Sequence, residues 1–481
     1  MSVSAPVKLT IKDYKSDLHN DWCPGCVAPA TRILTRSGSA PIAEIKVGDT
    51  VLGHDGKYHR VTEVMSHWHD APMQHLTVQF LGDVTLTNDH PVWSWLTVGG
   101  IRVMDWRPAG DLRAGDLIAY PTAAMSRSTG TREAVAAGSR PARPLAEITP
   151  DEEYVFLRVE KNETIAYAGY VHNLEVEDVH SYATEVGALH NCGDFGILTG
   201  IQMALAQLQL DPDKVALFSG IGCSGKTPHY VNAYGFHTLH GRVLPVATGG
   251  RLANTDITVL ALGGDGDGYG IGAGYFVNTG RRNLDFTYMV HNNNVYGLTK
   301  GQASPTLSKG KKTKSMPEQA IQDGINPIAM AVAAGYTFIA RGYALEPKYV
   351  ASLIVRAIQH KGSALVDVLQ TCPTYNDLYT KEWYEGADLP EKKSRLYKLE
   401  ERGYDGKVQD PTDEQEIAAK KAGAVARSYE REPIPIGVYY QVDLPTYEDE
   451  IYKRIPALKD KPLAETDTFK RDINPLLEAM R

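Results

Sequence analysis

The arrangement of apolar and polar residues changes twice along the chain, near residues 26 and 192. Between these two points, short runs alternate apolar and polar residues, as at 50–52, 59–64 and 74–80. Alternation with a period of two predicts half-buried strands. Many such strands separated by turn signals indicate an all-β unit.

Two further features refine this β block. The turn at Gly115-Asp116 repeats the one at Gly48-Asp49 and hints at an internally duplicated fold. Residues 122–147 are rich in Ala, Ser, Arg, Gly and Pro, which indicates a flexible surface loop. Strands are expected to resume at 154–159 and 171–176.

After residue 192 the runs lengthen and alternate in type. Apolar residues at helical spacing predict one helix, and continuous apolar runs predict buried strands. The expected helices are 196–210, 318–335 and 347–360, and the expected strands are 214–218, 257–262, 284–290 and 364–369. Such βα alternation predicts a doubly wound, mostly parallel α/β sheet. After Cys372 the chain is charged and punctuated by proline, and we expect it to wrap this sheet as an extension.

Composition narrows the class of protein. With 481 residues, 43% hydrophobic and 22% charged, the chain is typical of a soluble globular protein of two to four domains. A net charge of −8 argues against a nucleic-acid partner. The chain lacks a membrane-length apolar run and begins without a signal-peptide core, so we expect a cytoplasmic protein with no membrane partner. Five cysteines are too few for a disulfide scaffold and favour metal or catalytic roles.

The residues at the ends of the β block are those that a self-excising segment needs. The block begins at Cys26 and ends at His190-Asn191, and Cys192 follows it. If residues 26–191 are lifted out, the flanks join as Trp-Cys-Pro-Gly-Cys-Gly-Asp-Phe-Gly. We therefore interpret the chain as one enzyme with a splicing element inserted in a metal-ligand motif.

Splicing chemistry assigns a role to each end. Cys26 supplies the thiol that attacks the preceding carbonyl, and Cys192 then accepts the upstream chain. Asn191 cyclises to release the block, helped by His190 and by His180. Thr87 and His90 lie three apart on a turn and could activate the first scissile peptide, although a lone Thr-x-x-His is usually an ordinary surface turn.

On these residues, block 26–191 resembles a mini-intein of the Hint fold without a homing endonuclease. The resemblance implies that Cys26 is the first nucleophile, that Thr87 and His90 form the second-block pair, and that residues 171–180 form the penultimate block. One departure is Asn173, which stands where an Asp or Cys is usual. Cys23 lies three residues before Cys26, so oxidation of this pair could stall splicing; a role for Cys23 only as a host ligand is the alternative.

The strongest site signal of the host follows its predicted strand 257–262. Gly264-Asp265-Gly266-Asp267 comes directly after that strand, and Asn293 follows the next one. Glycines allow close backbone approach to phosphates, while Asp265, Asn293 and the Val295 carbonyl offer oxygen ligands for Mg²⁺. The spacing resembles the thiamine-diphosphate motif.

A second segment, 220–227, also satisfies the P-loop pattern G-x-x-x-x-G-K-[ST]. Cys223 at its centre and Pro228 directly after it disfavour nucleotide binding. A P-loop nucleotide-binding protein therefore stays open only as an alternative.

Four host cysteines remain after excision: Cys23, Cys192, Cys223 and Cys372. Four thiolates can hold a [4Fe–4S] cluster, and zinc could use the same set. Thiamine chemistry favours iron, because decarboxylation leaves electrons that a nearby one-electron carrier can accept.

Taken together, residues 1–25 and 192–375 resemble the β subunit of the 2-oxoacid:ferredoxin oxidoreductases. The resemblance implies oxidative decarboxylation of a 2-oxoacid (2-oxoglutarate or pyruvate type) to an acyl-CoA, with thiamine diphosphate, Mg²⁺ and a [4Fe–4S] cluster, and with ferredoxin as electron acceptor. It also implies an α or fused αγ partner subunit that completes the site. Lys300 could read a distal substrate carboxylate, and His240 and Arg242 could line the pocket or be structural.

The sequence thus predicts an α/β thiamine-diphosphate-binding fold with an inserted all-β Hint domain. The expected divisions are a host N-terminal segment (1–25), a mini-intein (26–191), a thiamine-diphosphate-binding oxidoreductase domain (192–375) and a C-terminal extension (376–481). A non-redox thiamine-diphosphate decarboxylase or synthase is the alternative within enzymes, and it would lack the cysteine set.

Overall fold

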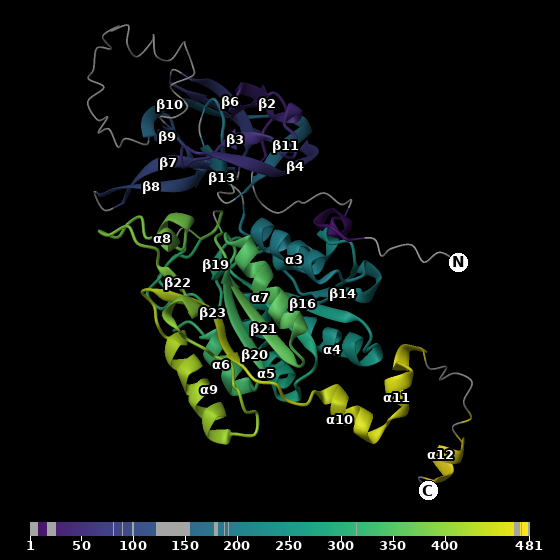
Figure 1. Ribbon diagram of the computed structural model, residues 1–481. Coiled ribbons are helices and arrows are strands. Elements are labelled where there is room, and N and C mark those ends of the chain that lie inside the picture. Colours follow the sequence, from purple (N-terminus) through teal and green to yellow (C-terminus); the bar gives the residue numbers. More distant parts are fainter. Residues whose placement is uncertain are drawn as a thin grey trace.

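The computed structural model describes residues 8–16, 26–79, 81–88, 90–98, 101–121, 154–177, 181–186, 188–190, 192–313, 315–372, 374–376, 378–465, 472 and 474–479. It contains a β lobe and a larger α/β domain, which Figure 1 shows in purple to blue and in teal to yellow. Three of the predicted splicing or cluster residues, Cys23, His180 and Asn191, and the predicted loop 122–147 lie outside the described residues.

The β lobe consists of two antiparallel sheets. Their strand orders are β11-β4-β3-β1-β2 and β12-β13-β7-β9-β10-β5-β6, with β8 paired to β7. The strands are β1 (Arg32–Thr35), β2 (Gly38–Pro41), β3 (Thr50–Leu52), β4 (Tyr58–Asp70), β5 (Met73–Val78), β6 (Gly82–Thr87), β7 (Pro91–Val98), β8 (Ile101–Pro108), β9 (Leu117–Pro121), β10 (Tyr154–Ile165), β11 (Ala168–Val176), β12 (Ser181–Ala183) and β13 (Ala188–His190). Inward-facing residues such as Val51, Leu86 and Leu174 form a core that belongs to this lobe alone. The predicted all-β unit is confirmed.

The two Gly-Asp turns adopt the same local structure. Gly48 and Gly115 have φ values of 99° and 100°, a region open to glycine. The carboxylates of Asp49 and Asp116 each accept the N–H three residues earlier at 2.8 Å. Each turn follows a short 3₁₀ segment, η2 (Ile42–Glu44) or η3 (Ala109–Asp111). These matching turns are what an internal duplication predicts.

The α/β domain is built on an eight-stranded sheet of order β15-β14-β16-β17-β21-β20-β23-β22. Its strands are β14 (Val215–Ser219), β15 (Tyr234–His237), β16 (Thr258–Gly264), β17 (Phe286–Asn292), β20 (Phe338–Tyr343), β21 (Ser363–Leu369), β22 (Leu396–Lys398) and β23 (Ile434–Gln441). All neighbouring pairs are parallel except β20 with β23. Strands β14, β17 and β21 are buried along their whole length, which explains their continuous apolar runs.

Helices connect and cover the strands of this sheet. They are α3 (Asp194–Leu208), α4 (Val243–Ala253), α5 (Ala273–Arg282), α6 (Pro327–Ala334), α7 (Pro347–Gln359), α8 (Lys381–Glu385), α9 (Glu414–Ser428), α10 (Tyr447–Arg454), α11 (Ala457–Asp460) and α12 (Asn474–Ala479). The predictions for α3 and α7 are confirmed within two residues at each end. The predicted helix 318–335 is wrong in its first half, because α6 begins only after Asn326, whose side chain caps Ala329 N–H at 3.2 Å.

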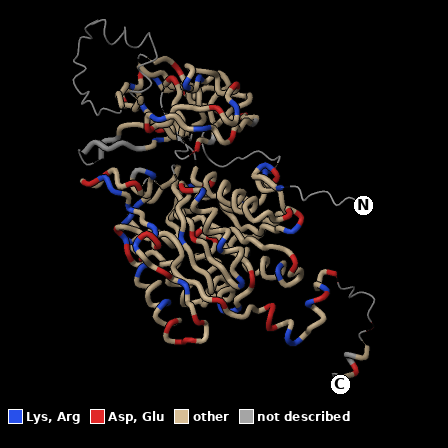
Figure 2. Tube along the Cα trace, viewed as in Figure 1, with Lys and Arg blue, Asp and Glu red and all other residues tan. Residues whose placement is uncertain are grey.

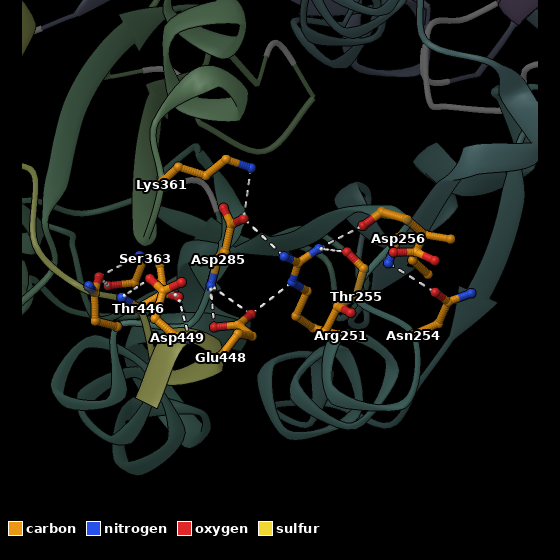
Figure 3. A network of polar contacts seen from close by, with 12 residues as sticks. Arg251, Asn254, Thr255, Asp256, Asp285, Lys361, Ser363, Thr446, Glu448 and Asp449 are labelled. Atoms are coloured by element: carbon orange, nitrogen blue, oxygen red, sulfur yellow. Dashed lines mark hydrogen bonds and ion pairs between the residues drawn. The ribbon is translucent and has the colours of Figure 1, made fainter. Parts of the chain in front are cut away.

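The segment after Cys372 is part of this domain rather than only a wrapping tail. Strand β23 extends the main sheet beside β20, and β22 follows it at the edge. Farther on, α10 is tied to the domain by the network in Figure 3, in which Arg251 donates to Glu448 at 2.8 Å and to Asp285 at 2.9 Å. Both carboxylates are largely buried, so the three charges satisfy one another away from water.

Charges of both signs are interspersed over both parts of the molecule, while most of the central strands are uncharged (Figure 2). Within the described residues, no helix has the length and apolar character needed to span a membrane.

Candidate functional site

The predicted cofactor residues meet at the carboxyl edge of the parallel sheet. The chain leaves β14 towards β15 on one side and returns to β16 on the other, which creates the kind of crevice where α/β proteins bind ligands. A cavity of about 290 Å³ opens there. It is lined by Ile221, Gly222, Cys223, Ser224, His240, Gly264, Asp265, Gly266, Asp267, His291, Asn293, Val295, Tyr296, Gly297, Leu298 and Thr299.

Asp265 is the buried carboxylate of this cavity. Its Oδ2 accepts hydrogen bonds from the Ser304 hydroxyl at 2.5 Å, from Thr306, and from Asn294 N–H at 3.2 Å. Burial raises the pKa of Asp265 to about 6, and the two hydroxyls partly offset that shift by stabilising the ionised form. A cation bound beside Asp265 would supply the positive charge that the described surroundings lack.

Asp267 organises the opposite wall of the cavity. Its Oδ1 accepts the N–H groups of Gly241 at 2.7 Å and Ile221 at 3.1 Å, and it lies 3.1 Å from His240 Nδ1. This contact gives His240 a role in holding the wall as well as a place in the lining. The segment that matches the P-loop pattern therefore contributes a wall to the same cavity, through Ile221 to Ser224.

The glycines are required by close packing. A Cβ on Gly266 would lie 2.2 Å from the Tyr296 ring, and one on Gly268 would lie 2.0 Å from the Tyr288 hydroxyl. The chain turns at Asn294 in the left-handed region, with φ of 63°. Asn293 Oδ1 accepts Val295 N–H at 3.1 Å, which holds these two predicted ligands in one turn.

Two residues predicted near the cofactor are not among the described cavity lining. The Arg242 guanidinium lies 4.9 Å from the Tyr275 ring centre on the neighbouring helix. Lys300 is exposed in a turn with φ of 77°, one residue beyond the lining residue Thr299. Both lie close in sequence to lining residues, but their described contacts point to turn and helix packing.

The donor set fits a magnesium-bound diphosphate. Asp265, the Asn293 amide and the Val295 carbonyl are oxygen ligands of the hard type that Mg²⁺ selects, and all three residues line one cavity. The buried Asp267 Oδ2 and Ser224 Oγ have no hydrogen-bond partner among the described residues. Such polar atoms are suited to a polar ligand.

Three of the four predicted cluster cysteines, Cys192, Cys223 and Cys372, lie near enough to interact electrostatically, and Cys223 lines the cavity. Burial, then Asp194, then the nearby thiols of Cys223 and Cys372 raise the pKa of Cys192 well above its ordinary value. Among the described residues, no group of three or more His, Cys, Asp and Glu side chains has the geometry of a metal site. The fourth predicted ligand, Cys23, lies outside those residues.

A buried chain of polar groups connects these thiols with the cofactor cavity. The Cys192 thiol lies 3.3 Å from Asp194 Oδ2, and Asp194 Oδ1 lies 2.6 Å from His291 Nδ1. His291 lines the cavity, and its buried Nε2 has no hydrogen-bond partner among the described residues. The sequence interpretation missed Asp194 and His291, although both border predicted motifs.

The β lobe brings the residues of its own predicted chemistry together. Cys26 N–H donates to Thr87 Oγ1 at 2.9 Å, and Thr87 N–H donates to the Cys26 carbonyl at 2.8 Å. His90 is fully buried in the turn that follows. At the other end, β13 pairs with β12 and with β7, so that His190 lies opposite Ser181 and Leu189 opposite Val92. Both ends of the lobe thus lie beside β6 and β7, the strands that flank the Thr87 turn.

Asn173 has a partner that the sequence interpretation missed. The Tyr182 hydroxyl donates to Asn173 Oδ1 at 2.7 Å, and both side chains are buried. Burial, then the Cys26 thiol, raises the pKa of Tyr182 well above its ordinary value, which places that thiol close to the tyrosine. Tyr182 therefore bonds the residue that departs from the intein pattern and interacts electrostatically with the first nucleophile.

Comparisons with known proteins agree with this division. Residues 220–368 match the family model of the thiamine pyrophosphate enzyme C-terminal TPP binding domain, and residues 372–454 match that of the C-terminal part of the pyruvate ferredoxin oxidoreductase beta chain. The β subunit of 2-oxoacid:ferredoxin oxidoreductase 1 from Aeropyrum pernix is 50% identical over 305 residues, which cover 92% of that protein and 62% of this chain. The alignment leaves a long part of this chain unused.

One solved structure covers the host part of the chain. A 2-oxoglutarate:ferredoxin oxidoreductase from Magnetococcus marinus matches with a TM-score of 0.51 and 33% identity, over 60% of this chain and 90% of that one. The gp41-1 intein aligns over 35% of this chain and 98% of its own, at 17% identity and a TM-score of 0.24. The chain, which carries a thiamine-diphosphate-binding domain and an inserted β lobe, belongs to the β subunits of the 2-oxoacid:ferredoxin oxidoreductases.

Proposed function

We propose that this chain is a self-splicing precursor of the catalytic β subunit of a 2-oxoacid:ferredoxin oxidoreductase. Residues 26–191 excise themselves, and the joined segments 1–25 and 192–481 then work in oxidative decarboxylation of a 2-oxoacid to an acyl-CoA. The observation that carries the proposal is a pair of contacts: Cys26 is held by Thr87 inside the lobe, while Cys192 lies among host thiols beside the cofactor cavity.

Splicing proceeds by exchange of acyl bonds. The Cys26 thiol attacks the Gly25 carbonyl, so that the peptide bond before Cys26 becomes a thioester. The Cys192 thiol takes over this acyl group and releases the Cys26 thiol. The Asn191 amide nitrogen then attacks its own carbonyl and breaks the peptide bond before Cys192, and an S-to-N acyl shift leaves Gly25 bonded to the Cys192 nitrogen. No oxidant or cofactor is needed.

The geometry around Cys26 suits the first step. The hydroxyl of Thr87 accepts the N–H of the scissile peptide, and the backbone pairing of the two residues fixes that contact. Such positioned polar groups stabilise charge as it develops on a peptide under attack. Buried His90 follows on the same turn and is the proposed acid for the departing nitrogen, with His190 and His180 serving the second junction.

In the spliced subunit, Asp265, Asn293 and Val295 would hold Mg²⁺ and thereby the diphosphate of thiamine diphosphate. Bound thiamine diphosphate supplies the carbanion-stabilising chemistry of decarboxylation. Cys23, Cys192, Cys223 and Cys372 would hold a [4Fe–4S] cluster for electron transfer to ferredoxin. Lys300, on the turn after the cavity, would face the distal end of a substrate such as 2-oxoglutarate, and coenzyme A and an α or αγ subunit would complete the reaction.

The test is to express the chain, weigh the products and record the absorption spectrum of the purified host. We expect an excised fragment of residues 26–191, a ligated chain of 1–25 joined to 192–481, and a broad iron–sulfur absorption near the visible region. Recovery of only the full-length chain under reducing conditions would overturn the splicing part. A ligated host that binds thiamine diphosphate but no iron would overturn the redox part in favour of a non-redox enzyme.

A further inference from the structure

A second cavity lies at the same edge of the main sheet, beyond the cofactor site. It has a volume of about 300 Å³ and lies where the C-terminal segment meets the thiamine-diphosphate-binding domain. Its residues come from the ends of β17, β20 and β21, from the α8 region, and from the segment before β23: Asn292, Asn294, Thr306, Ser308, Lys311, Arg341, Tyr379, Trp383, Tyr384, Arg431 and Glu432 are among them. Carboxyl edges of parallel sheets and contacts between domains are the usual places for ligand sites.

Arg341 is a buried cation in the lining of this cavity. The side chain is 8% exposed and lines the cavity, although it belongs to a central strand. Its Nε donates to Asp367 Oδ2 at 2.9 Å, and its guanidinium also hydrogen-bonds the side chain of Tyr439, whose ring centre lies 5.8 Å away. These two contacts use two of the five guanidinium N–H donors, so the side chain keeps planar donors for a ligand in the cavity that it lines. A planar donor pair of this kind suits a carboxylate or phosphate group.

The other charges around the cavity favour an anion. Lys311 and Arg431 are exposed residues of the lining, and Arg431 reaches Ser308 at 3.5 Å. The two lining acids are already engaged, because Glu430 accepts the Tyr397 hydroxyl at 2.6 Å and Glu432 pairs with Arg395 at 3.4 Å. Among the described lining residues, Lys311 and Arg431 thus have no acidic partner, while Arg341 shares its charge with Asp367.

An aromatic wall faces these cations. The rings of Tyr379 and Trp383 lie 4.9 Å apart, and those of Trp383 and Tyr384 lie 5.0 Å apart, both edge to face. The Trp383 ring is held from behind by the Arg395 guanidinium at 4.8 Å. Rigid aromatic side chains offer a flat apolar surface for the body of a ligand.

Contacting polar side chains connect this cavity to the cofactor site. Asp367 Oδ1 accepts the Asn292 amide at 3.1 Å, and Asn292 Oδ1 lies 3.0 Å from Thr306 Oγ1. Thr306 in turn donates to Asp265. A buried chain of hydrogen bonds therefore runs from Arg341 to the proposed magnesium ligand, and it separates the two cavities.

We propose that this cavity is a second ligand site, which binds a metabolite-sized molecule with one carboxylate or phosphate group on a planar or apolar body. The oxyanion pairs with the guanidinium of Arg341, and the body packs on Tyr379 and Trp383. The proposal does not depend on splicing or on the redox reaction, since every residue in it lies downstream of the inserted lobe.

The test uses calorimetric titration of the full chain, kept in one form by Cys26→Ala and Asn191→Ala and saturated with Mg²⁺ and thiamine diphosphate. The probes are benzoate, its uncharged counterpart benzamide, and inorganic phosphate. We expect benzoate to bind at least about tenfold more tightly than benzamide, as a charge-assisted contact predicts. Stronger binding of phosphate than of benzoate would assign the oxyanion to the phosphate class and still support the site.

Arg341→Lys is the main variant, because lysine keeps the charge beside Asp367 but lacks the guanidinium fork. We expect it to weaken binding of the preferred anion about tenfold or more, while Arg281→Lys, the same change on the outside of α5, leaves it unchanged. Arg431→Gln, at the exposed rim, should weaken binding about two- to threefold without risk to folding. Absence of binding by both anions at roughly 10 mM, or equal binding by the wild type and Arg341→Lys, would overturn the proposal.

Discussion

The inserted lobe and the host domain place Cys26 and Cys192 in different surroundings. Cys26 lies in a site built from the lobe's own strands, with Thr87 on one side and Tyr182 close by. Cys192 lies in the core of the host and contacts Asp194 and Gln370. Each half therefore supplies most of the surroundings of its own thiol, with Met65 of the lobe as a member of the core cluster that contains Cys192.

The same contrast separates the two cofactor sites of the host. Every described residue that lines the thiamine-diphosphate cavity lies downstream of the insert, so this site forms in the unspliced chain. The proposed cluster needs Cys23 and Cys192, which the insert separates by its full length. On the proposed splicing, the thiamine-diphosphate cavity is therefore formed before ligation, whereas the cluster ligands are joined only after it.

Few described polar contacts connect the two halves. Lys15 pairs with Glu63 at 3.5 Å and Lys348 pairs with Glu177 at 3.2 Å. Pairs as exposed as these contribute about 0–1 kcal/mol each. One buried lobe side chain, Met65, also packs in the host core, so the predictions below test how far the two units unfold independently.

The largest effect is expected at the splice junctions, where the change is all or none. Cys26→Ala removes the first nucleophile, so the chain should remain at full length. Cys192→Ala leaves that first step intact but blocks transfer, so hydroxylamine should release residues 1–25 from it. Intact-mass measurement distinguishes the two variants. Ligated product from Cys26→Ala would break the assignment of all splicing chemistry to the lobe.

The second prediction concerns the thiamine-diphosphate cavity, which should form before splicing. In the splicing-blocked chain (Cys26→Ala with Asn191→Ala), Mg²⁺ and thiamine diphosphate should bind within about threefold of their affinity for the spliced host, because the insert contributes nothing to the described cavity lining. Oxidation of the 2-oxoacid should be absent from the same sample, since the insert still separates Cys23 from Cys192 along the chain.

Asp265→Asn is the control for that experiment. It removes the buried carboxylate from the proposed ligand set and should weaken Mg²⁺ binding by the same factor in both forms, about 10- to 100-fold. Isothermal titration measures both affinities. A blocked chain that turns over substrate, or one that does not bind the cofactor, would contradict the division between the two sites.

Sequence patterns predicted local chemistry better than long-range partners. Cys26 and Thr87 were predicted together because splicing needs them, and the structure joins their backbones. The pair Asp194 and His291 was missed, since its two residues come from separate elements 97 positions apart. Helix α6 was predicted too long, because the capping side chain of Asn326 and Pro327 at the first helical position mark a start that apolar periodicity alone does not reveal.

The third prediction tests the separate stability of the host. Arg251→Leu leaves Glu448 buried without its cation and Asp285 with only the exposed Lys361, which should lower the host's free energy of unfolding by about 3–5 kcal/mol. The β lobe should keep its own transition in the same calorimetric scan. Lys361→Met removes an exposed partner of Asp285 and should change stability by less than about 0.5 kcal/mol. Equal shifts of both transitions in Arg251→Leu would show that the halves unfold as one.

The fourth prediction uses pH to perturb the lobe. His54 is buried against Trp93 and Trp106, and its Nδ1 lies 2.6 Å from the Ser181 hydroxyl. Burial, then the charge of Lys381, lowers the pKa of His54 to about 3. The folded lobe thus keeps this ring neutral while the unfolded chain binds a proton below about 6.5, so stability is lost as pH falls through that range.

Between pH 7 and pH 5 this single group should lower the lobe's free energy of unfolding by about 2 kcal/mol. His54→Gln keeps a hydrogen-bonding group near Ser181 but cannot titrate, so its lobe should lose much less. The pKa of Asp55, the acidic neighbour, is lowered to about 2, which places its titration below this window. Thermal unfolding at the two pH values measures the difference. Identical losses in the wild type and in His54→Gln would remove His54 from the explanation.

The smallest effect is expected at Tyr182. It tests whether the hydrogen bond from this tyrosine to Asn173 supports splicing. The tyrosine hydroxyl donates to Asn173 Oδ1 at 2.7 Å, and Leu174 N–H donates to the same oxygen at 2.9 Å. Tyr182→Phe removes one of these two contacts, worth about 1 kcal/mol, so splicing should slow about three- to tenfold rather than stop. Tyr170→Phe, on an exposed ring of the same lobe, is the matched control and should splice at the wild-type rate. If the two variants splice equally fast, the Tyr182 hydroxyl does not contribute to positioning Asn173, and the backbone alone holds this residue in place.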